Sequence, residues 1–191
     1  MLNGMRFDLD LMARLVGSSG TKLAEQALIS ARKTVMLGGT IAALVFLPGL
    51  VLTSIFDITT RRIFQFSSTP LQELTWHFFF AMVMFGIGYV YLKDNHVRVD
   101  ILRERLPLCW KINIERALLL LLLIPLSLVM IWFSTRMAWL SYLQGEGSRA
   151  ALGLSARWIV KSALPIGALL LFFAACYRLF LPEQPREKLR C

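Results

Sequence analysis

The sequence predicts an all-α integral membrane protein with four transmembrane helices plus short interfacial amphipathic helices. Of its 191 residues, 57% are hydrophobic and only 17% are charged. The apolar residues come in blocks of about twenty, the length that a helix needs to cross a hydrocarbon core of roughly 30 Å. A soluble domain of this size would instead spread its apolar residues at the period of a helix or a strand.

The basic residues support the same fold class. The formal net charge is +9, but the lysines and arginines cluster beside the apolar blocks instead of covering one face. This distribution is typical of residues that set membrane topology and bind anionic lipid head groups. Membrane lipids are therefore expected partners, and nucleic acid is not.

Cysteine usage gives no sign of a metal site. The chain has three cysteines, with no CxxC spacing and no cluster of Cys and His: Cys109, Cys176 and Cys191. A structural zinc site is not predicted from such a pattern, and an odd number does not build a complete disulfide framework.

The predicted elements follow the apolar blocks. Residues 1–34 form a helical segment on the cytoplasmic membrane surface, which we expect the GSSG sequence at 17–20 to interrupt. A membrane domain, 35–180, follows, and a charged cytoplasmic tail ends the chain at 181–191. The four predicted spans are about 35–56, 71–92, 114–135 and 158–180.

Helix starts, helix ends and kinks can be assigned in these spans. Pro48, and Pro125 in the third span, are expected to kink their helices. Asp57 and Arg61 are four residues apart and can form an ion pair if the first helix continues past the apolar block. Glu73 falls in the first turn of the second span, where an acid suits the helix dipole.

Other features concern the surfaces of these helices. The stretch 137–143 carries Trp139 and Tyr142 and is predicted to be interfacial. Close helix contact is expected at five small residues: Gly38, Gly39, Ala42, Gly86 and Gly88.

Orientation follows from the positive charges. Lysines and arginines are concentrated in the N-terminal segment, in the stretch 93–111 and in the tail. The other side of the membrane would hold fewer of them: Arg61, Arg62, Arg136, Arg149 and Arg157. The bias predicts that both termini lie in the cytoplasm.

The stretch 93–107, KDNHVRVDILRERLP, is predicted to be an amphipathic turn at the cytoplasmic interface. His96 and Asp100 are four residues apart and could be a catalytic base with its carboxylate. Because no nucleophile accompanies them, a structural hydrogen bond that fixes the turn is the favoured interpretation. Three further residues are expected to hold the turn to lipid head groups: Arg98, Arg103 and Arg105.

Haem binding and solute transport by this chain alone are both disfavoured. His77 and His96 lie at opposite ends of one span, roughly 28 Å apart at 1.5 Å per residue, so they cannot ligate one haem. Ionisable residues that mark a transport pathway are almost absent from the span interiors. The sequence therefore predicts a membrane scaffold that works with a partner.

Two separated motifs resemble the DctQ family, the small membrane subunits of TRAP transporters. The first comprises the Glu73-Leu74 pair that opens the second span, Gly86, and the segment HVRVD at 96–100. The second is a pattern around the start of the fourth span, which Ser155 interrupts where a proline is usual: Glu146, Ser148, Gly153, Leu154, Arg157, Trp158, Lys161, Pro165 and Gly167.

The resemblance implies a role in a three-part importer of the bacterial inner membrane. A periplasmic binding protein would deliver an organic acid, and a large permease subunit would move it with a sodium gradient. The small subunit would brace the large one and present a surface to the binding protein. It would carry no catalytic, cofactor or metal site. Sodium is expected on the large subunit.

Candidate contact residues follow from this role. Three outer arginines are candidates for docking the binding protein, with interfacial anchoring as an equal alternative: Arg136, Arg149 and Arg157. Candidate subunit or helix-end contacts are Glu73, Trp76, Trp158 and Lys161. A standalone membrane adaptor or assembly factor is the alternative function, and a membrane-bound redox or hydrolytic enzyme is a weaker third.

Overall fold

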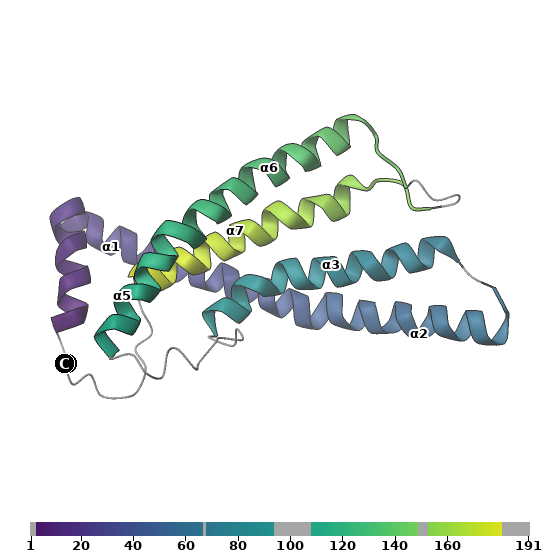
Figure 1. The fold of residues 1–191 in the computed structure, drawn as a ribbon, viewed down its shortest axis with the longest axis horizontal. Coiled ribbons are helices and arrows are strands. Elements are labelled where there is room, and N and C mark those ends of the chain that lie inside the picture. Colours follow the sequence, from purple (N-terminus) through teal and green to yellow (C-terminus); the bar gives the residue numbers. More distant parts are fainter. Residues whose placement is uncertain (1–2, 67, 94–107, 149–152, 181–191) are drawn as a thin grey trace.

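The computed structural model describes residues 3–66, 68–93, 108–148 and 153–180, and their regular secondary structure is entirely helical (Figure 1). Four helical stretches are long and apolar enough to cross a membrane: Lys22–Ile63, Thr69–Leu92, Asn113–Leu143 and Trp158–Phe180. The predicted all-α fold with four helices of membrane-spanning length is confirmed. The elements in chain order are α1 (Asn3–Ile41), η1 (Ala42–Phe46), α2 (Leu47–Ile63), α3 (Thr69–Leu92), α5 (Leu108–Leu118), η2 (Leu119–Leu123), α6 (Ile124–Leu143) and α7 (Trp158–Phe180).

The second and fourth helices match the predicted spans closely, whereas the first and third are longer. α2 continues seven residues past Phe56 to Ile63, and Arg61 Nη2 lies 2.7 Å from Asp57 Oδ2, which confirms the predicted ion pair. α6 continues through the stretch 137–143 to Leu143. The predicted break at 17–20 is wrong, because α1 runs through it; glycine lowers helix propensity, but an established helix propagates through it at modest cost.

Two prolines coincide with a change in helix geometry. The π-helical segment η1 ends two residues before Pro48, and η2 ends two residues before Pro125. Proline lacks an N–H, and its ring collides with the carbonyl group four residues earlier. A wider π turn moves that carbonyl group away from the proline ring. The predicted disturbance of helix geometry therefore lies on the N-terminal side of each proline.

The helices form two hairpins, α2–α3 and α6–α7, and α7 lies at the centre of the bundle (Figure 1). α7 packs against α1, α3 and α6, and α3 also packs against α1 and α2. In Figure 1, α7 lies between α6 and α3, and the two hairpins diverge towards the end that carries the α2–α3 and α6–α7 connections. We call this end the loop end, and the opposite end of the bundle the core end.

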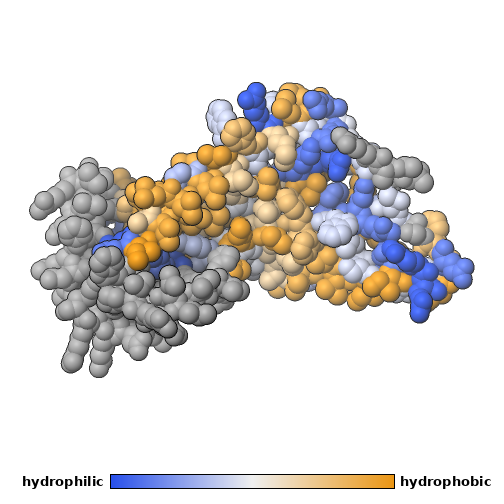
Figure 2. All heavy atoms as spheres, viewed as in Figure 1, coloured by the Kyte–Doolittle hydropathy of each residue, from blue (hydrophilic) through white to orange (hydrophobic). Residues whose placement is uncertain are grey.

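The core end holds the most deeply buried apolar cluster. Val35 of α1, Leu92 of α3, and Leu170 and Ala174 of α7 form it. Hydrophobic side chains elsewhere are largely exposed, as expected of helices whose neighbour is lipid or another subunit. Figure 2 shows orange hydrophobic residues across the middle of the visible face and blue hydrophilic residues gathered near the loop end.

Close approach between α3 and α7 depends on two glycines. A Cβ atom at Gly167 would lie 2.6 Å from the Met84 carbonyl oxygen, and one at Gly88 would lie 2.9 Å from that of Leu170. Gly88 was among the predicted small contact residues and Gly167 was not. Gly86 was also predicted. A Cβ atom there would meet only Ala42, at the ordinary contact distance of 3.9 Å, so packing does not require a glycine at this position.

The serines of α6 repeat at seven-residue intervals on its buried face. Ser127, Ser134 and Ser141 are each at most 4% exposed, while α6 packs against α7. A seven-residue repeat keeps one stripe of a helix against a partner, and small side chains there allow backbones to approach. Ser127 and Ser134 donate to carbonyl oxygens of their own helix, so burial leaves neither hydroxyl unsatisfied.

Arg178 joins three elements at the core end. Its Nη1 donates to the Tyr91 carbonyl oxygen at 3.2 Å, which satisfies a group in the last turn of α3. The guanidinium carbon lies 5.1 Å from the centroid of the Tyr91 ring. Its Nη2 is 3.9 Å from Glu115 Oε1 of α5. The Arg178 side chain is only 12% exposed, so this arginine is a structural part of the core end.

Candidate functional site

Glu73 lies in the second turn of α3 and not in the first turn as predicted, because the helix starts at Thr69. It ties the two hairpins together at the loop end. Its Oε1 accepts a hydrogen bond from the Ser148 hydroxyl, and its Oε2 accepts one from the Leu154 N–H at 2.7 Å. Ser148 and Leu154 both belong to the connection between α6 and α7. One carboxylate therefore holds α3 to a segment that lies 75 and 81 positions away in sequence.

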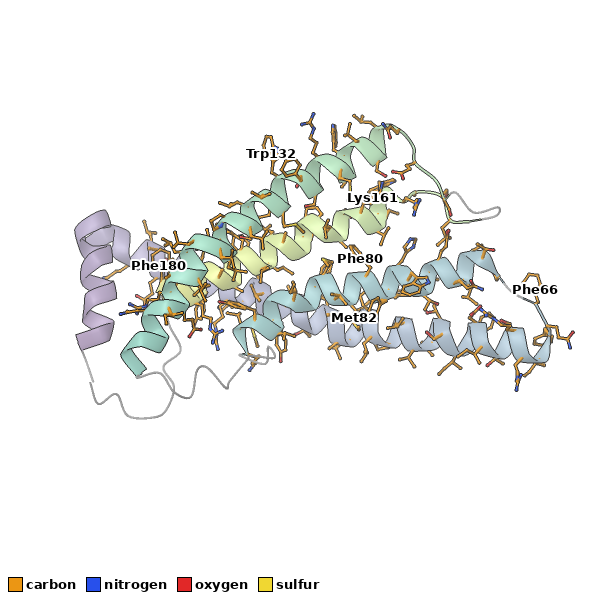
Figure 3. The ribbon with its side chains drawn as sticks, viewed as in Figure 1. Phe66, Phe80, Met82, Trp132, Lys161 and Phe180 are labelled. Carbon is orange, nitrogen blue, oxygen red and sulfur yellow. The ribbon has the colours of Figure 1, made fainter. Side chains whose placement is uncertain are left out.

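Glu146 organises the same connection from within. Its Oε2 accepts hydrogen bonds from Lys161 Nζ and, at 2.7 Å, from Ser141 Oγ. Arg157 Nη1 lies 4.0 Å from its Oε1. Figure 3 labels Lys161 near the start of α7, at the loop end. Glu146 thus links the last turns of α6 to the first turn of α7.

The electrostatic consequence is clearest for Glu146, which lies between the spans. The hydrogen bonds from Lys161 and Ser141 hold the pKa of its carboxyl below the ordinary value of 4.5, although partial desolvation opposes this. The group is therefore a carboxylate at neutral pH, which is the form that accepts both hydrogen bonds.

Backbone hydrogen bonds close the connection on itself. The Arg157 N–H donates to the Glu146 carbonyl oxygen at 3.0 Å, and the Ser148 N–H donates to that of Leu154 at 3.0 Å. We call the whole arrangement the loop-end clamp: Glu73, Ser141, Glu146, Ser148, Leu154, Arg157 and Lys161.

Gly153 is required by the close approach of α3 to this connection. A Cβ atom there would lie 3.0 Å from Glu73 Oε1 and would collide with the Ser148 side chain. Because Ser148 and Glu73 are hydrogen-bonded to each other, they cannot both move aside without breaking that bond. The lack of space for a side chain therefore explains why the second sequence motif has a glycine at this position.

A cleft of about 570 Å³ opens beside the clamp, between α3 and α6 and over the start of α7. We call it the α3–α6 cleft. Its polar edge is formed by clamp residues and by His77, which is half-buried. Aromatic and aliphatic side chains form the rest. The lining residues are Glu73, Trp76, His77, Phe79, Phe80, Met137, Arg157, Val160 and Lys161.

The predicted subunit or helix-end residues all lie at the loop end. Glu73 and Lys161 belong to the clamp. Trp76 is 69% exposed and makes an edge contact with Phe79, with ring centroids 6.1 Å apart. Trp158 makes an edge contact with Tyr142 of α6 at 5.3 Å. The structure thus places these four residues at the same end of the bundle, while their contact with a partner stays a prediction.

Two of the three predicted docking arginines lie in the described residues. Arg157 lies in the clamp and its side chain is 40% exposed. Arg136 lies exposed on α6. Arg149 falls outside the described residues, as does the predicted cytoplasmic turn with His96, Arg98, Asp100, Arg103 and Arg105.

Sequence reasoning missed two polar residues of this site. Ser141 was not singled out, although its spacing of seven from Ser134 was a signal of the buried face of α6. His77 was weighed only as a haem ligand. Its position four residues after Glu73 places both on one side of α3, which could have assigned it to the same cleft.

The clamp's carboxylates accept hydrogen bonds from neighbouring groups of the chain. Among the described residues, no group of three or more His, Cys, Asp or Glu side chains could hold a metal ion. Chemically, the arrangement joins helices and presents a half-polar cleft beside them.

Comparison with known families identifies the chain. The sequence profile described as "Tripartite ATP-independent periplasmic transporters, DctQ component" matches residues 50–183. This match covers well over half of the 191 residues and includes both motifs that meet in the clamp. No individually curated protein matches the sequence. The chain belongs to the DctQ family and is a small membrane component of a tripartite ATP-independent periplasmic (TRAP) transporter.

Proposed function

We propose that this chain is the scaffold subunit of its transporter in the bacterial inner membrane. It braces a large permease subunit for sodium-coupled uptake of an organic acid that a periplasmic binding protein delivers. In the orientation that the positive charges favour, both termini are cytoplasmic and the loop end is periplasmic. Substrate and sodium are handled by the large subunit.

The observation that carries this proposal is the loop-end clamp. Glu73 and Glu146 accept hydrogen bonds from this chain's own side chains and backbone. A carrier would need such groups to face a moving solute and to exchange partners. Fixed contacts between two hairpins suit a part that holds its shape while another subunit moves.

Reconstitution tests the proposal. The large subunit is placed in proteoliposomes with and without this chain, together with the binding protein, and uptake of labelled organic acids is followed under an inward sodium gradient. We expect uptake only when this chain is present and only with sodium. Equal uptake without this chain would reject the scaffold role and leave an adaptor without a transport role.

A further inference from the structure

The α3–α6 cleft is bordered by three helices. Its floor is the first turns of α7, which contacts both α3 and α6. In Figure 1, α3 and α6 lie on opposite sides of α7. The volume of about 570 Å³ is in the range of pockets that take a compact ligand or several side chains.

The side walls of this cleft are apolar and belong to helices of membrane-spanning length. Phe79 and Phe80 come from α3, Met137 from α6 and Val160 from α7. Each of these residues lies within a helix that is long and apolar enough to span a membrane. An occupant must therefore present apolar side chains to the cleft.

His77 adds a polar requirement. It lies eight residues after the start of α3, about 12 Å along the helix axis. The imidazole is half-buried and forms no hydrogen bond with another described residue. At this depth an acyl chain offers it no partner, whereas a polar side chain on a helix does.

The charges of the cleft are balanced within the chain. Lys161 is paired with Glu146, and the Glu73 carboxylate lies near the positive Arg157. The occupant therefore does not need a net charge. An apolar helix with one polar side chain matches the cleft better than an ionic ligand does.

We propose that the α3–α6 cleft seats a transmembrane helix of the large permease subunit, with His77 hydrogen-bonded to a polar side chain of that helix. This inference rests on the proposed function and adds the place of contact. In this proposal the clamp fixes the spacing of the cleft's walls, so that the helix of the large subunit can bind between them.

The test uses the complex of this chain with the large subunit, purified through a tag on this chain. Val160→Trp fills the cleft and should lower the recovered large subunit roughly tenfold, because overpacking displaces the seated helix. The control is Val129→Trp, since Val129 is 51% exposed on α6 and does not line the cleft. We expect His77→Leu to weaken recovery and His77→Gln to restore most of it.

A second measurement does not rely on overpacking the cleft. A benzophenone amino acid at Met137 should cross-link to the large subunit on illumination, and one at Val129 should not. Cross-links from Met137 to phospholipid alone, or full recovery with Val160→Trp, would overturn the inference and leave the scaffold role intact. If the unaltered chain does not recover the large subunit, the proposed function itself fails.

Discussion

The residues of the clamp show why two separated motifs occur together in one chain. Glu73 supplies both oxygens to the α6–α7 connection, and Gly153 leaves the space for it. Removing the carboxylate leaves the Leu154 N–H without its acceptor. An unsatisfied donor of this kind is unfavourable, so the connection should rearrange.

Glu73→Gln is expected to loosen the connection while α3 stays folded, because the amide nitrogen cannot accept one of the two hydrogen bonds. Limited proteolysis of the purified chain should show faster cleavage in the α6–α7 connection than in the unaltered protein. Gln72→Glu, on the same turn, serves as a control for a change of charge. Equal cleavage rates in all three would argue against the hydrogen bonds.

The Glu146 carboxylate predicts a dependence on pH. Its pKa is below 4.5 in the folded chain because Lys161 and Ser141 donate to it. Its stabilising contribution is therefore complete above about pH 4.5 and is lost as the pH falls through the lower folded value. Thermal stability of the unaltered chain should fall in this range more than that of Glu146→Gln. Parallel acid profiles for the two proteins would contradict the assignment.

In the described part of the connection, Ala156 is the non-glycine residue with a positive φ. Its φ is +68°, in the left-handed region that favours glycine. Ala156→Gly should raise the free energy of unfolding by up to about 1 kcal/mol, since it relieves this conformation at a smaller entropic cost. A loss of stability on this substitution, measured by unfolding in detergent, would show that the Ala156 methyl group contributes packing.

At the scale of the elements, the contact between α3 and α7 decides how the hairpins are joined. Gly88 and Gly167 each face a carbonyl oxygen of the other helix. Backbone cannot move aside as a flexible side chain can. The spacing of these two helices is therefore fixed by the absence of side chains at two positions.

Gly167→Ala is expected to lower the free energy of unfolding by roughly 1–3 kcal/mol through overpacking. The matched control is Gly86→Ala, whose added methyl group would meet only Ala42 at an ordinary distance. The two variants should differ clearly in unfolding midpoint. Equal midpoints would indicate that the helices separate at no cost.

The elements also show what the sequence could predict and what it could not. α3 and α7 were found within two residues of their ends, because apolar blocks of membrane length are a strong pattern with clear starts. α2 and α6 continue past the predicted spans, because polar residues after an apolar block end the hydropathy pattern without ending the helix. Pro48 and Pro125 were recognised, but a proline can disturb a helix with or without a π turn, so the form of the disturbance could not be predicted.

At the scale of the whole molecule, the helices are joined at both ends of the bundle. Arg178 and the buried apolar cluster join the helices at the core end, and the clamp joins them at the loop end. The sequence motifs contained every member of the clamp except Ser141, but they did not show how these residues pair. Pairing across 75 or more positions depends on how the hairpins pack, which neither periodicity nor spacing encodes.

The central claim is that Glu73 and Ser148 act as one unit that holds the two hairpins together. A double-mutant cycle tests it most directly, with Glu73→Ala, Ser148→Ala and the double variant unfolded in mixed micelles. Glu73→Ala with Ser127→Ala is the control pair, because Ser127 bonds to its own helix. The structure predicts a coupling free energy for Glu73 and Ser148 well above that of the control pair. Additive effects of Glu73→Ala and Ser148→Ala, equal to the control, would contradict the clamp.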